Sequence, residues 1–468
     1  MYRQSWIKYK VEDIIFDLFD GPHATPKPSN SGSVFLGIKN ISESNSLDLS
    51  QIRRISDSDF GKWTKRVLPK KDDLVFVYEA TLDRYALIPD NLKCCLGRRM
   101  ALLRLNKAMV SPKFLLYYFG SSEWKQTVNR NLIVGATVNR IPISEFPKFQ
   151  LRLPKLKTQK SIAKVLSDLD AKIEVNNKIN QELESMAKTL YDYWFVQFDF
   201  PMSEEYATSI GKPELAGKPY KASGGKMVFN RELKREIPEG WEVDSFSSWI
   251  KNDKSGDWGK EAEQGNYVNK VFCIRGADLN GLNGKGEVKS PTRYILEKNS
   301  HKLLEIGDFI IEISGGSPIQ STGRMAFITK ETLERFENPL ICSNFCKAVT
   351  LKEERALFNF AYEWNRLYDA GVLFGWEGKT SGIKNLLFES FVTNHQVAIP
   401  DSGIMEQFYN KAKPIHAQIQ TNLKQNQKLA ALRDWLLPML MNGQVTVKDA
   451  YYEVDEELGM VAEEKVKY

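Results

Sequence analysis

Two long apolar stripes with identical spacing constrain the fold of this chain more than any other sequence feature. Between residues 162 and 194, seam positions recur in alternating steps of four and three, the a/d pattern of a long helix packed lengthwise on another helix. A shift of 246 positions produces a second seam with the same steps. The positions are Ile162, Leu166, Leu169, Ile173, Asn176, Asn180, Leu183, Ala187, Leu190 and Trp194, then Phe408, Ala412, Ile415, Ile419, Asn422, Asn426, Leu429, Arg433, Leu436 and Leu440. We therefore expect one element to occur twice.

Matched asparagines interrupt both seams at the same two steps. A polar residue at a seam position costs stability and is tolerated where it sets register and partner. If the helices pair antiparallel, Asn176 lies near Asn426 and Asn180 near Asn422, so that each amide has a complementary amide. At 1.5 Å per residue, such a pair forms a rod of roughly 50 Å.

The rest of each half reads as a mixed α+β domain. Short β-like runs alternate with helical patterns and turn residues, without regular βαβ alternation. The pattern of residues 1–153 returns from Pro238 onward. Residues 241–250 correspond to 6–15, 272–275 to 35–38, 307–311 to 72–76, 346–351 to the strand ending at Leu105, and 378–385 to 135–140. The chain is therefore predicted to be an internal repeat, domain–helix–domain–helix.

Six segments follow from this organisation. A stretch rich in Gly, Pro, Lys, Ser and Glu after the first helix is predicted to be a linker or surface excursion, and the C-terminal end is predicted to be a solvated, frayed acidic tail. The segments are domain 1 at 1–153, a long helix at 154–198, the excursion at 199–237, domain 2 at 238–400, a second long helix at 401–445 and the tail at 446–468.

Composition narrows the class of protein. Hydrophobic residues make up 42% and charged residues 26%, and no stretch approaches the roughly 18 apolar residues of a membrane helix. The N-terminus lacks a signal-like apolar run, so we expect a cytoplasmic protein. The five cysteines form no CxxC pair and are predicted to be reduced core thiols. A net charge of +6 permits a nucleic-acid partner without requiring one.

The sequence shows no pattern of a catalytic or metal site. GxGxxG, a P-loop, HExxH, GxSxG and the Pro-Pro motif of amino-methyltransferases are all missing, and the four histidines are scattered. We therefore predict no catalytic residue, no metal and no cofactor on this chain.

Several segments resemble the specificity subunit of Type I restriction–modification systems. The resemblance rests on the duplicated layout and on four local segments, and it covers essentially the whole chain except the acidic tail. Residues 190–201 (LYDYWFVQFDFP) and 432–438 (LRDWLLP) with 442–443 resemble the ends of the family's two long helices, and 224–229 and 237–241 its entry into the second domain.

The resemblance implies a non-catalytic DNA reader. Each globular domain would read one half of a bipartite, asymmetric DNA site, and the helices would fix the unread gap and dock two methyltransferase (modification) subunits. A restriction/translocase subunit would join for cleavage, with S-adenosylmethionine and ATP/Mg bound only by these partners. A rod of roughly 50 Å matches about one and a half turns of B-DNA.

Base readout requires Arg, Lys, Asn, Gln, Ser or Thr on loops that reach a groove, and phosphate contacts outnumber base contacts. The candidates in the first domain are Lys39, Asn40, Arg84, Arg98, Arg99, Thr137, Asn139 and Arg140. Those in the second are Arg275, Ser314, Ser317, Gln320, Arg324, Asn344, Lys379, Thr380 and Lys384. For each of them a surface or structural role is at least as frequent as base contact.

Two other functions remain open from the sequence. A coiled-coil scaffold would bind proteins through its globular domains without reading DNA. A standalone nuclease or methyltransferase would need the motifs that are missing. Sequence-specific DNA binding that weakens steeply with salt distinguishes a DNA reader from the scaffold.

Overall fold

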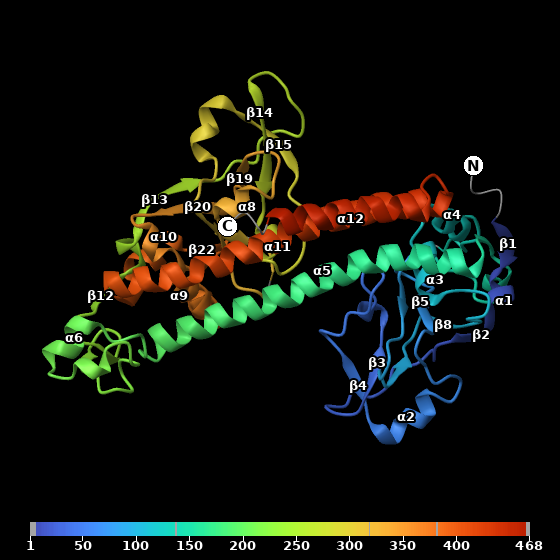
Figure 1. Cartoon of the computed structure of the whole chain (residues 1–468), viewed down its shortest axis with the longest axis horizontal. Helices are drawn as coiled ribbons and strands as arrows, with labels where there is room; N and C mark the ends of the chain where they lie inside the picture. Colours follow the sequence, from blue (N-terminus) through green and yellow to red (C-terminus); the bar gives the residue numbers. More distant parts are fainter. Residues whose placement is uncertain (1–5, 136–137, 318, 381, 465–468) are drawn as a thin grey trace. The chain divides into compact units, whose positions relative to one another are not determined.

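The computed structural model describes residues 6–135, 138–317, 319–380 and 382–464, and for residues 379, 380 and 457–464 it describes the backbone alone. Contacts divide the chain into two compact units, Met1–Ile173 with Gln427–Tyr468, and Glu174–Asn426. Two long helices, α5 (Leu156–Tyr191) and α11 (Ser402–Asn442), each contribute to both units (Figure 1). The α+β class and the two long helices expected from the seams are thus confirmed.

Two sheets form the globular part of the first unit. One has the strand order β2-β8-β5-β6 with all neighbours antiparallel. The other has the order β4-β3-β7, in which β3 pairs antiparallel with β4 and parallel with β7. Strand β1 pairs with β9 and joins the two ends of the domain. The strands are β1 (Ile7–Lys10), β2 (Ile15–Asp20), β3 (Ser33–Leu36), β4 (Arg53–Ile55), β5 (Leu74–Val77), β6 (Tyr85–Leu87), β7 (Cys94–Leu96), β8 (Met100–Leu105) and β9 (Gln150–Leu153).

Strand β5 shows why the four-stranded sheet lies inside the unit. Its four residues are apolar and buried, and successive side chains of a strand point to opposite faces. Leu74 and Phe76 join the apolar cluster on one face, whereas Val75 and Val77 join the cluster on the other. The continuous apolar run therefore places β5 between two cores.

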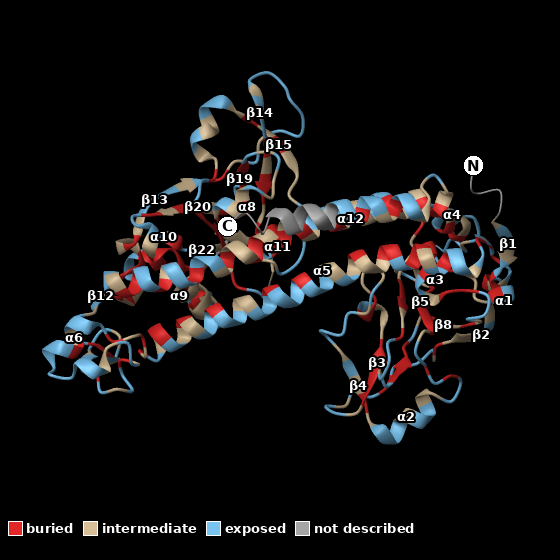
Figure 2. Cartoon of the chain, viewed as in Figure 1, coloured by how far each residue is buried: buried red, intermediate tan, exposed pale blue. Residues whose placement is uncertain are grey.

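Helices cover the first of these faces. Helix α3 begins at Pro112 directly after Ser111, a position where the fixed φ of proline suits the first turn. Leu166 and Leu169 of α5 and Leu436 of α11 are fully buried in the same cluster. Figure 2 shows buried stretches along both long helices. The helices of this unit are α1 (Val11–Ile14), α2 (Asp57–Trp63), α3 (Pro112–Phe119), α4 (Ser122–Arg130) and α12 (Val447–Glu464), with short 3-10 turns at Ile38–Asn40 and Phe146–Lys148.

The second unit repeats both sheets. Their strand orders are β13-β20-β16-β18 and β15-β14-β19, with β14 and β19 parallel, and β12 pairs with β23 as β1 pairs with β9. A further sheet, β17-β22-β21, stands where the first unit has isolated bridges from Arg140 to Glu79 and Ile133. The strands are β12 (Glu242–Ser245), β13 (Ile250–Ser255), β14 (Tyr267–Ile274), β15 (Thr292–Leu296), β16 (Phe309–Glu312), β17 (Ser314–Gly315), β18 (Met325–Phe327), β19 (Leu340–Cys342), β20 (Cys346–Leu351), β21 (Glu377–Thr380), β22 (Ile383–Leu386) and β23 (Gln396–Ile399).

An aromatic core joins the second unit to its share of the long helices. Trp364 of α9, Phe408 of α11 and Trp194, in the π-helical turn Asp192–Val196 that follows α5, are buried in one cluster. The helices are α7 (Leu279–Leu282), α8 (Lys330–Leu333), α9 (Leu357–Asp369) and α10 (Phe388–Asn394), with 3-10 turns at Phe246–Ser248, Gly276–Asp278, Glu297–Lys302, Glu354–Ala356 and Val372–Trp376.

The repeat extends to irregular features of the backbone. A register shift follows Ile15 where β2 meets β8, and the same shift follows Ile250 where β13 meets β20. Asp73 and Asp308 are both buried just before the equivalent strands β5 and β16. A bulge and a buried carboxylate thus recur at equivalent positions of the two units, which a packing requirement alone would not explain.

The structure shifts one predicted correspondence by a single residue. Residues 272–275 were expected to match 35–38, but the 3-10 turns that follow β3 and β14 begin at Ile38 and Gly276. Gly37 therefore corresponds to Arg275, and Asn40 to Asp278. The side chains of Asn40 and Asp278 both accept a hydrogen bond from the backbone N–H three residues earlier, at 2.9 and 3.0 Å. Local capping, which the apolar pattern did not reveal, sets the register here.

The expected surface excursion at 199–237 is a packed subdomain. It contains α6 (Glu204–Ser209), a 3-10 turn at Pro213–Leu215 and a hairpin of β10 (Met227–Asn230) with β11 (Arg235–Pro238). Phe200 stacks on Tyr220 with ring centroids 4.7 Å apart, and both rings are buried. The Gly- and Pro-rich composition thus describes its turns, while a few aromatic residues supply a core.

The acidic C-terminal segment also differs from the expected frayed tail. Residues 447–464 form α12, and Ala450 and Val454 are buried in the core of the first unit. Their spacing of four residues gives the helix one apolar face, which accounts for its order. Among the described residues, no helix is long and apolar enough to cross a membrane.

Candidate nucleic-acid interface

Parallel strands β3 and β7 end at the same edge of their sheet. Several candidates for base readout, called readers below, follow these strands directly. Lys39 lies in the 3-10 turn after β3, and Arg98 lies in the turn between β7 and β8. Both side chains are exposed. A Cβ at Gly97 would stand 2.3 Å from the carbonyl oxygen of Leu36, so the close approach of the two strand ends requires glycine there.

A second group of readers surrounds Glu79 at the end of β5. Arg99, with a left-handed φ of 67°, accepts a hydrogen bond from the backbone of Tyr78 at 3.1 Å and places its Nε 3.0 Å from the Glu79 carboxylate. Arg140 forms a backbone bridge to Glu79. The side chains of Asn139 and Arg140 are exposed, and Thr137 lies outside the described residues. The structure therefore brings Arg98, Arg99, Asn139 and Arg140 to one edge.

Asn40 and Arg84 are engaged within the first domain. The Asn40 side chain is buried, and its amide donates to the carbonyl oxygens of Asp48 and Gln51 at 3.0 and 3.1 Å. The Arg84 guanidinium donates to the Ile41 carbonyl oxygen and to Glu43, each at 3.2 Å. Both residues therefore shape the loop at 40–51 and have structural partners within the domain.

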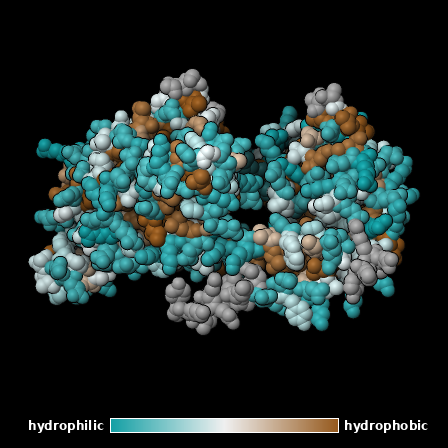
Figure 3. All heavy atoms as spheres, turned by 90° about the horizontal axis from the view of Figure 1, so that it is seen from above, coloured by the Kyte–Doolittle hydropathy of each residue, from teal (hydrophilic) through white to brown (hydrophobic). Residues whose placement is uncertain are grey.

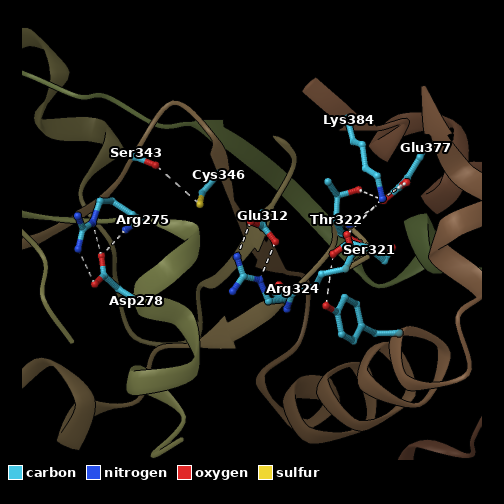
Figure 4. A network of polar contacts seen from close by, with 12 residues as sticks. Arg275, Asp278, Glu312, Ser321, Thr322, Arg324, Ser343, Cys346, Glu377 and Lys384 are labelled. Atoms are coloured by element: carbon cyan, nitrogen blue, oxygen red, sulfur yellow. Dashed lines mark hydrogen bonds and ion pairs between the residues drawn. The ribbon is translucent and has the colours of Figure 1, made fainter. Parts of the chain in front are cut away.

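The corresponding edge of the second domain is built from the ends of β14 and β19. Arg275 follows β14, and its guanidinium makes two hydrogen bonds to Asp278 at 2.8 and 3.1 Å and a third to the Lys289 carbonyl oxygen at 2.7 Å (Figure 4). Asn344 follows β19 and is exposed. Arg275 thus holds the loop at 275–289, whereas Asn344 faces solvent.

Two further predicted cations are held by carboxylates. Arg324 makes a bidentate pair with Glu312 at 2.8 and 2.6 Å, and Lys384 lies 3.1 Å from Glu377 (Figure 4). The Glu312 and Glu377 side chains are each only 7% exposed. Lys384 and the Thr322 backbone lower the pKa of Glu377 against the opposing effect of burial, so it remains ionised at neutral pH. These pairs organise the edge and are not available as readers.

The remaining polar candidates differ in exposure. The Ser314 hydroxyl donates to Asn385 at 2.6 Å. Ser317 is half-buried and Gln320 is exposed. Lys379 and Thr380 lie in β21, where only the backbone is described. Asn344 and Gln320 are therefore the predicted side chains of the second domain that the structure exposes most clearly.

Apolar side chains at this edge were missed by the sequence analysis. A concave pocket of about 590 Å³ is lined by Trp258, Phe345 and Ile383 together with the backbone of Gly315 and Gly316. Hydrogen bonding to base edges points only to polar residue types, and exposure of Phe345 cannot be inferred from a strand-like apolar run. Its position directly after the predicted reader Asn344 was the available signal.

The described residues contain no group of three or more His, Cys, Asp or Glu side chains that could hold a metal ion. All five cysteines are buried and free. Burial raises the pKa of the Cys95 thiol to about 12, so it is protonated at neutral pH and has little nucleophilic character. The arrangement offers binding surfaces and no described catalytic constellation.

The seam asparagines meet in the second unit. Asn176 donates to Asn426 at 2.9 Å and to Gln425 at 2.8 Å, and Asn422 donates to Asn180 at 2.8 Å. Residue numbers rise along α5 as they fall along α11, so the two helices run antiparallel here. The buried amides satisfy one another, as the complementary spacing of the seams predicts.

Comparisons with known proteins point to one family. The model of the Type I restriction modification DNA specificity domain matches residues 21–185. The chain is 23% identical over 412 residues to the Type I restriction enzyme MjaIX specificity subunit of Methanocaldococcus jannaschii, covering 85% of this chain and 83% of the relative. It is 22% identical to the HindI specificity subunit of Haemophilus influenzae, with 81% and 88% covered. The fold is similar to the crystal structure of a Type I restriction–modification S subunit from M. genitalium, with a TM-score of 0.54, 14% identity and 93% and 96% of the chains covered.

Proposed function

We infer the function of this chain from the family to which it belongs, the DNA specificity subunits of Type I restriction–modification systems. The chain is the non-catalytic, DNA-recognising member of such a complex. We propose that its two globular domains, the first recognition domain at residues 1–153 and the second at 238–400, each read one half of a bipartite, asymmetric DNA site. The complex then directs adenine methylation or, with the restriction subunit, cleavage.

The single observation that carries this proposal is the repeated edge. Equivalent strand ends, β3 with β7 and β14 with β19, present exposed polar side chains in both domains, Arg98 in the first and Asn344 in the second. Loops at the carboxyl ends of paired parallel strands gather residues that are distant in sequence, which is how a rigid framework carries a variable binding surface. Two such edges on one chain suit two half-sites.

The readers that we propose are the predicted residues whose side chains the structure leaves exposed. Arginine recognises guanine through O6 and N7, asparagine and glutamine recognise adenine, and lysine contacts phosphate or guanine. The set comprises Lys39, Arg98, Asn139, Arg140, Gln320 and Asn344. Arg99 supports this set through its contact with Glu79.

The long helices are proposed to set the unread spacer and to dock two methyltransferase subunits. The paired asparagines, Asn176 with Asn426 and Asn180 with Asn422, would fix the register of α5 against α11. Trp435 of α11 is 45% exposed, and an exposed tryptophan is a frequent anchor of protein interfaces. The partner subunits would supply S-adenosylmethionine, ATP and Mg²⁺.

The test is to co-express the chain with its methyltransferase subunit and to map adenine methylation across the host genome by single-molecule sequencing. The expected result is one split motif, two short specified halves around a fixed gap. Exchange of residues 1–153 for those of a relative should change one half and leave the other. A complex that assembles and binds S-adenosylmethionine but methylates no motif would contradict the proposal and favour the scaffold alternative.

A further inference from the structure

Figure 3 shows patches of hydrophobic residues that interrupt a largely hydrophilic face. The pocket of the second recognition domain is lined in part by apolar side chains. The side chains of Trp258, Phe345 and Ile383 line it and are 38%, 55% and 44% exposed. Monomeric proteins rarely leave aromatic rings clustered at a concave surface unless that surface binds something. The pocket lies at the ends of β14 and β19, directly beside the proposed reader Asn344.

The charged side chains around the pocket are engaged with one another. The carboxylate of Glu312 accepts both hydrogen bonds from Arg324, at 2.8 and 2.6 Å, and the Arg275 guanidinium is held by Asp278 (Figure 4). A Cβ at Gly276 would stand 2.6 Å from Glu312, so the turn packs tightly on this carboxylate. These contacts fix the shape of the pocket, and its open surface is left to apolar groups.

Trp258 is also held in place by a charged neighbour. The guanidinium of Arg293 lies over its ring, 4.2 Å from the centroid, and Arg293 pairs with Glu261 at 3.1 Å. A ring fixed in this way loses little conformational entropy on binding. The pocket is therefore preorganised on at least one wall.

The equivalent edge of the first domain has a different chemistry. In the first domain the backbone N–H of Tyr78 donates to the carbonyl oxygen of Arg99, at 3.1 Å. In the second, the backbone N–H of Ile313 donates to the carbonyl oxygen of Phe345, at 2.9 Å, so Phe345 occupies the position of Arg99. By the same register, Asn344 occupies the position of Arg98, and Ala277 that of Lys39. Where the first domain presents cations, the second presents an apolar wall.

We propose that this pocket receives the 5-methyl edge of a thymine in the half-site that the second domain reads, with Phe345 and Ile383 as specificity-determining contacts. The methyl group is the one apolar feature that distinguishes base edges in the major groove. An extruded base would require hydrogen-bond partners for its Watson–Crick edge, and Arg275 and Glu312 are already engaged. This inference rests on the proposed DNA-reading function and deepens it.

The test uses the complete complex of this chain with its methyltransferase subunits and the duplex identified by methylation mapping. Each thymine of the half-site assigned to the second domain is replaced in turn by deoxyuridine, which keeps base pairing and O4 but lacks the methyl group. At one position the affinity should fall about fourfold, the equivalent of burying one methyl group. Affinity is measured by fluorescence anisotropy at fixed salt.

Three variants assign the effect to the pocket. With Phe345→Ser, the thymine and deoxyuridine duplexes should bind equally, whereas Phe345→Leu should retain part of the difference. Phe229→Ser is the matched control, because Phe229 is 63% exposed in the same unit and does not line the pocket. It should leave the fourfold difference unchanged.

The outcomes separate the two proposals. If a split motif exists but deoxyuridine weakens binding at no position of this half-site, the thymine contact is wrong and bipartite reading still holds. If Phe345→Ser leaves the fourfold difference intact, the methyl group is read elsewhere and the pocket assignment is overturned. The absence of any methylated motif in an assembled complex would instead contradict the proposed function itself.

Discussion

In the first recognition domain, β5 ends at Val77, whose backbone N–H bonds to the carbonyl oxygen of Arg84. In the second, the same position is Glu312, bonded in the same way to Arg324. The valine packs in an apolar cluster, whereas the glutamate binds the arginine across the hairpin. The arginine is similarly exposed in both hairpins, at 21% and 18%, but its carboxylate partner is the exposed Glu43 in the first domain and the buried Glu312 in the second.

This difference distinguishes the features that the two sheets require from the side chains that can vary. Strand order, the bulge after the first strand and the buried aspartate before β5 and β16 occur in both domains. Side chains at the strand ends differ in charge, size and partners. A binding edge can thus change its chemistry while the two sheets keep their packing.

The largest expected effect comes from breaking the ion pair. Arg324→Ala leaves Glu312 buried without its partner and should lower the free energy of unfolding by about 3–5 kcal/mol. The equivalent change Arg84→Ala removes more exposed contacts and should cost less than about 1 kcal/mol. Urea denaturation of the purified chain measures both values.

A double variant sharpens this test. Glu312→Val with Arg324→Met replaces the ion pair by apolar side chains and should recover most of the stability that Arg324→Ala loses. Equal costs for Arg324→Ala and Arg84→Ala would show that the two hairpins are energetically alike and that burial of Glu312 adds nothing to the cost.

A smaller effect is expected from acid. Equivalent tyrosines contact a long helix in each unit, Tyr117 bonding to Asp170 and Tyr362 to His416. Burial lowers the pKa of His416 from about 6.5 to about 4, so the folded state holds it neutral. Between these pH values only the unfolded state takes up the proton, and stability falls by up to about 1.4 kcal/mol per pH unit as the pH drops below 6.5.

Hydrogen exchange at pH 7.0 and 5.0 checks this prediction locally. Protection of α9, which carries Tyr362, should fall more in the unaltered chain than in His416→Gln, which keeps an acceptor for the tyrosine but does not titrate. Peptides from α3, which carries Tyr117, should respond equally in both proteins. An identical acid response of α9 in the two proteins would exclude His416 as the cause.

The seams provide a third comparison. Asn176→Leu leaves the amides of Asn426 and Gln425 without a buried partner and should cost about 1–3 kcal/mol. In the first unit, the polar seam contact is the partly exposed pair Arg433–Asp170, at 2.9 Å, and Arg433→Leu should cost less than about 1 kcal/mol. The midpoints of urea denaturation of the two variants rank these costs. A larger loss for Arg433→Leu would contradict the assignment of the asparagines as the main polar contact of the helix pair.

The smallest effect concerns recognition by the first domain. Arg98→Ala should lower discrimination at one base pair roughly tenfold, within the range of a lost bidentate arginine–guanine contact. Methylation mapping should show one relaxed position in the half-site of the first domain and none in the other. Arg53→Ala, an exposed arginine on β4, serves as the control and should leave the motif unchanged.

The sequence predicted the repeated parts better than the individual sites. Seam periodicity and the recurring apolar runs are set by packing, so they identify α5, α11 and both domains from spacing alone. The partners of Arg324 and Arg275 depend on turn geometry that spacing does not encode. Asn40 illustrates the limit, since a polar residue after a strand is equally suited to reading a base and to capping a turn.

Predictions that rested on amino-acid composition agreed least with the structure. The Gly- and Pro-rich stretch after α5 reads as a linker, yet Phe200 and Tyr220 give it a core of stacked rings. The acidic end reads as solvated, yet Ala450 and Val454 align on one helical face and are buried. In both segments a small number of apolar side chains, correctly spaced, decides the structure.

The division of the chain into units has a consequence for its biosynthesis. The second unit, Glu174–Asn426, is one continuous segment, whereas the first joins Met1–Ile173 to Gln427–Tyr468. The core of the first unit includes Leu429 and Leu436, which are synthesised after the whole second unit. The first domain to be synthesised therefore completes its core only after the second unit has been made, and a chain truncated after Asn426 would contain all residues of the second unit but leave apolar residues of the first unit uncovered.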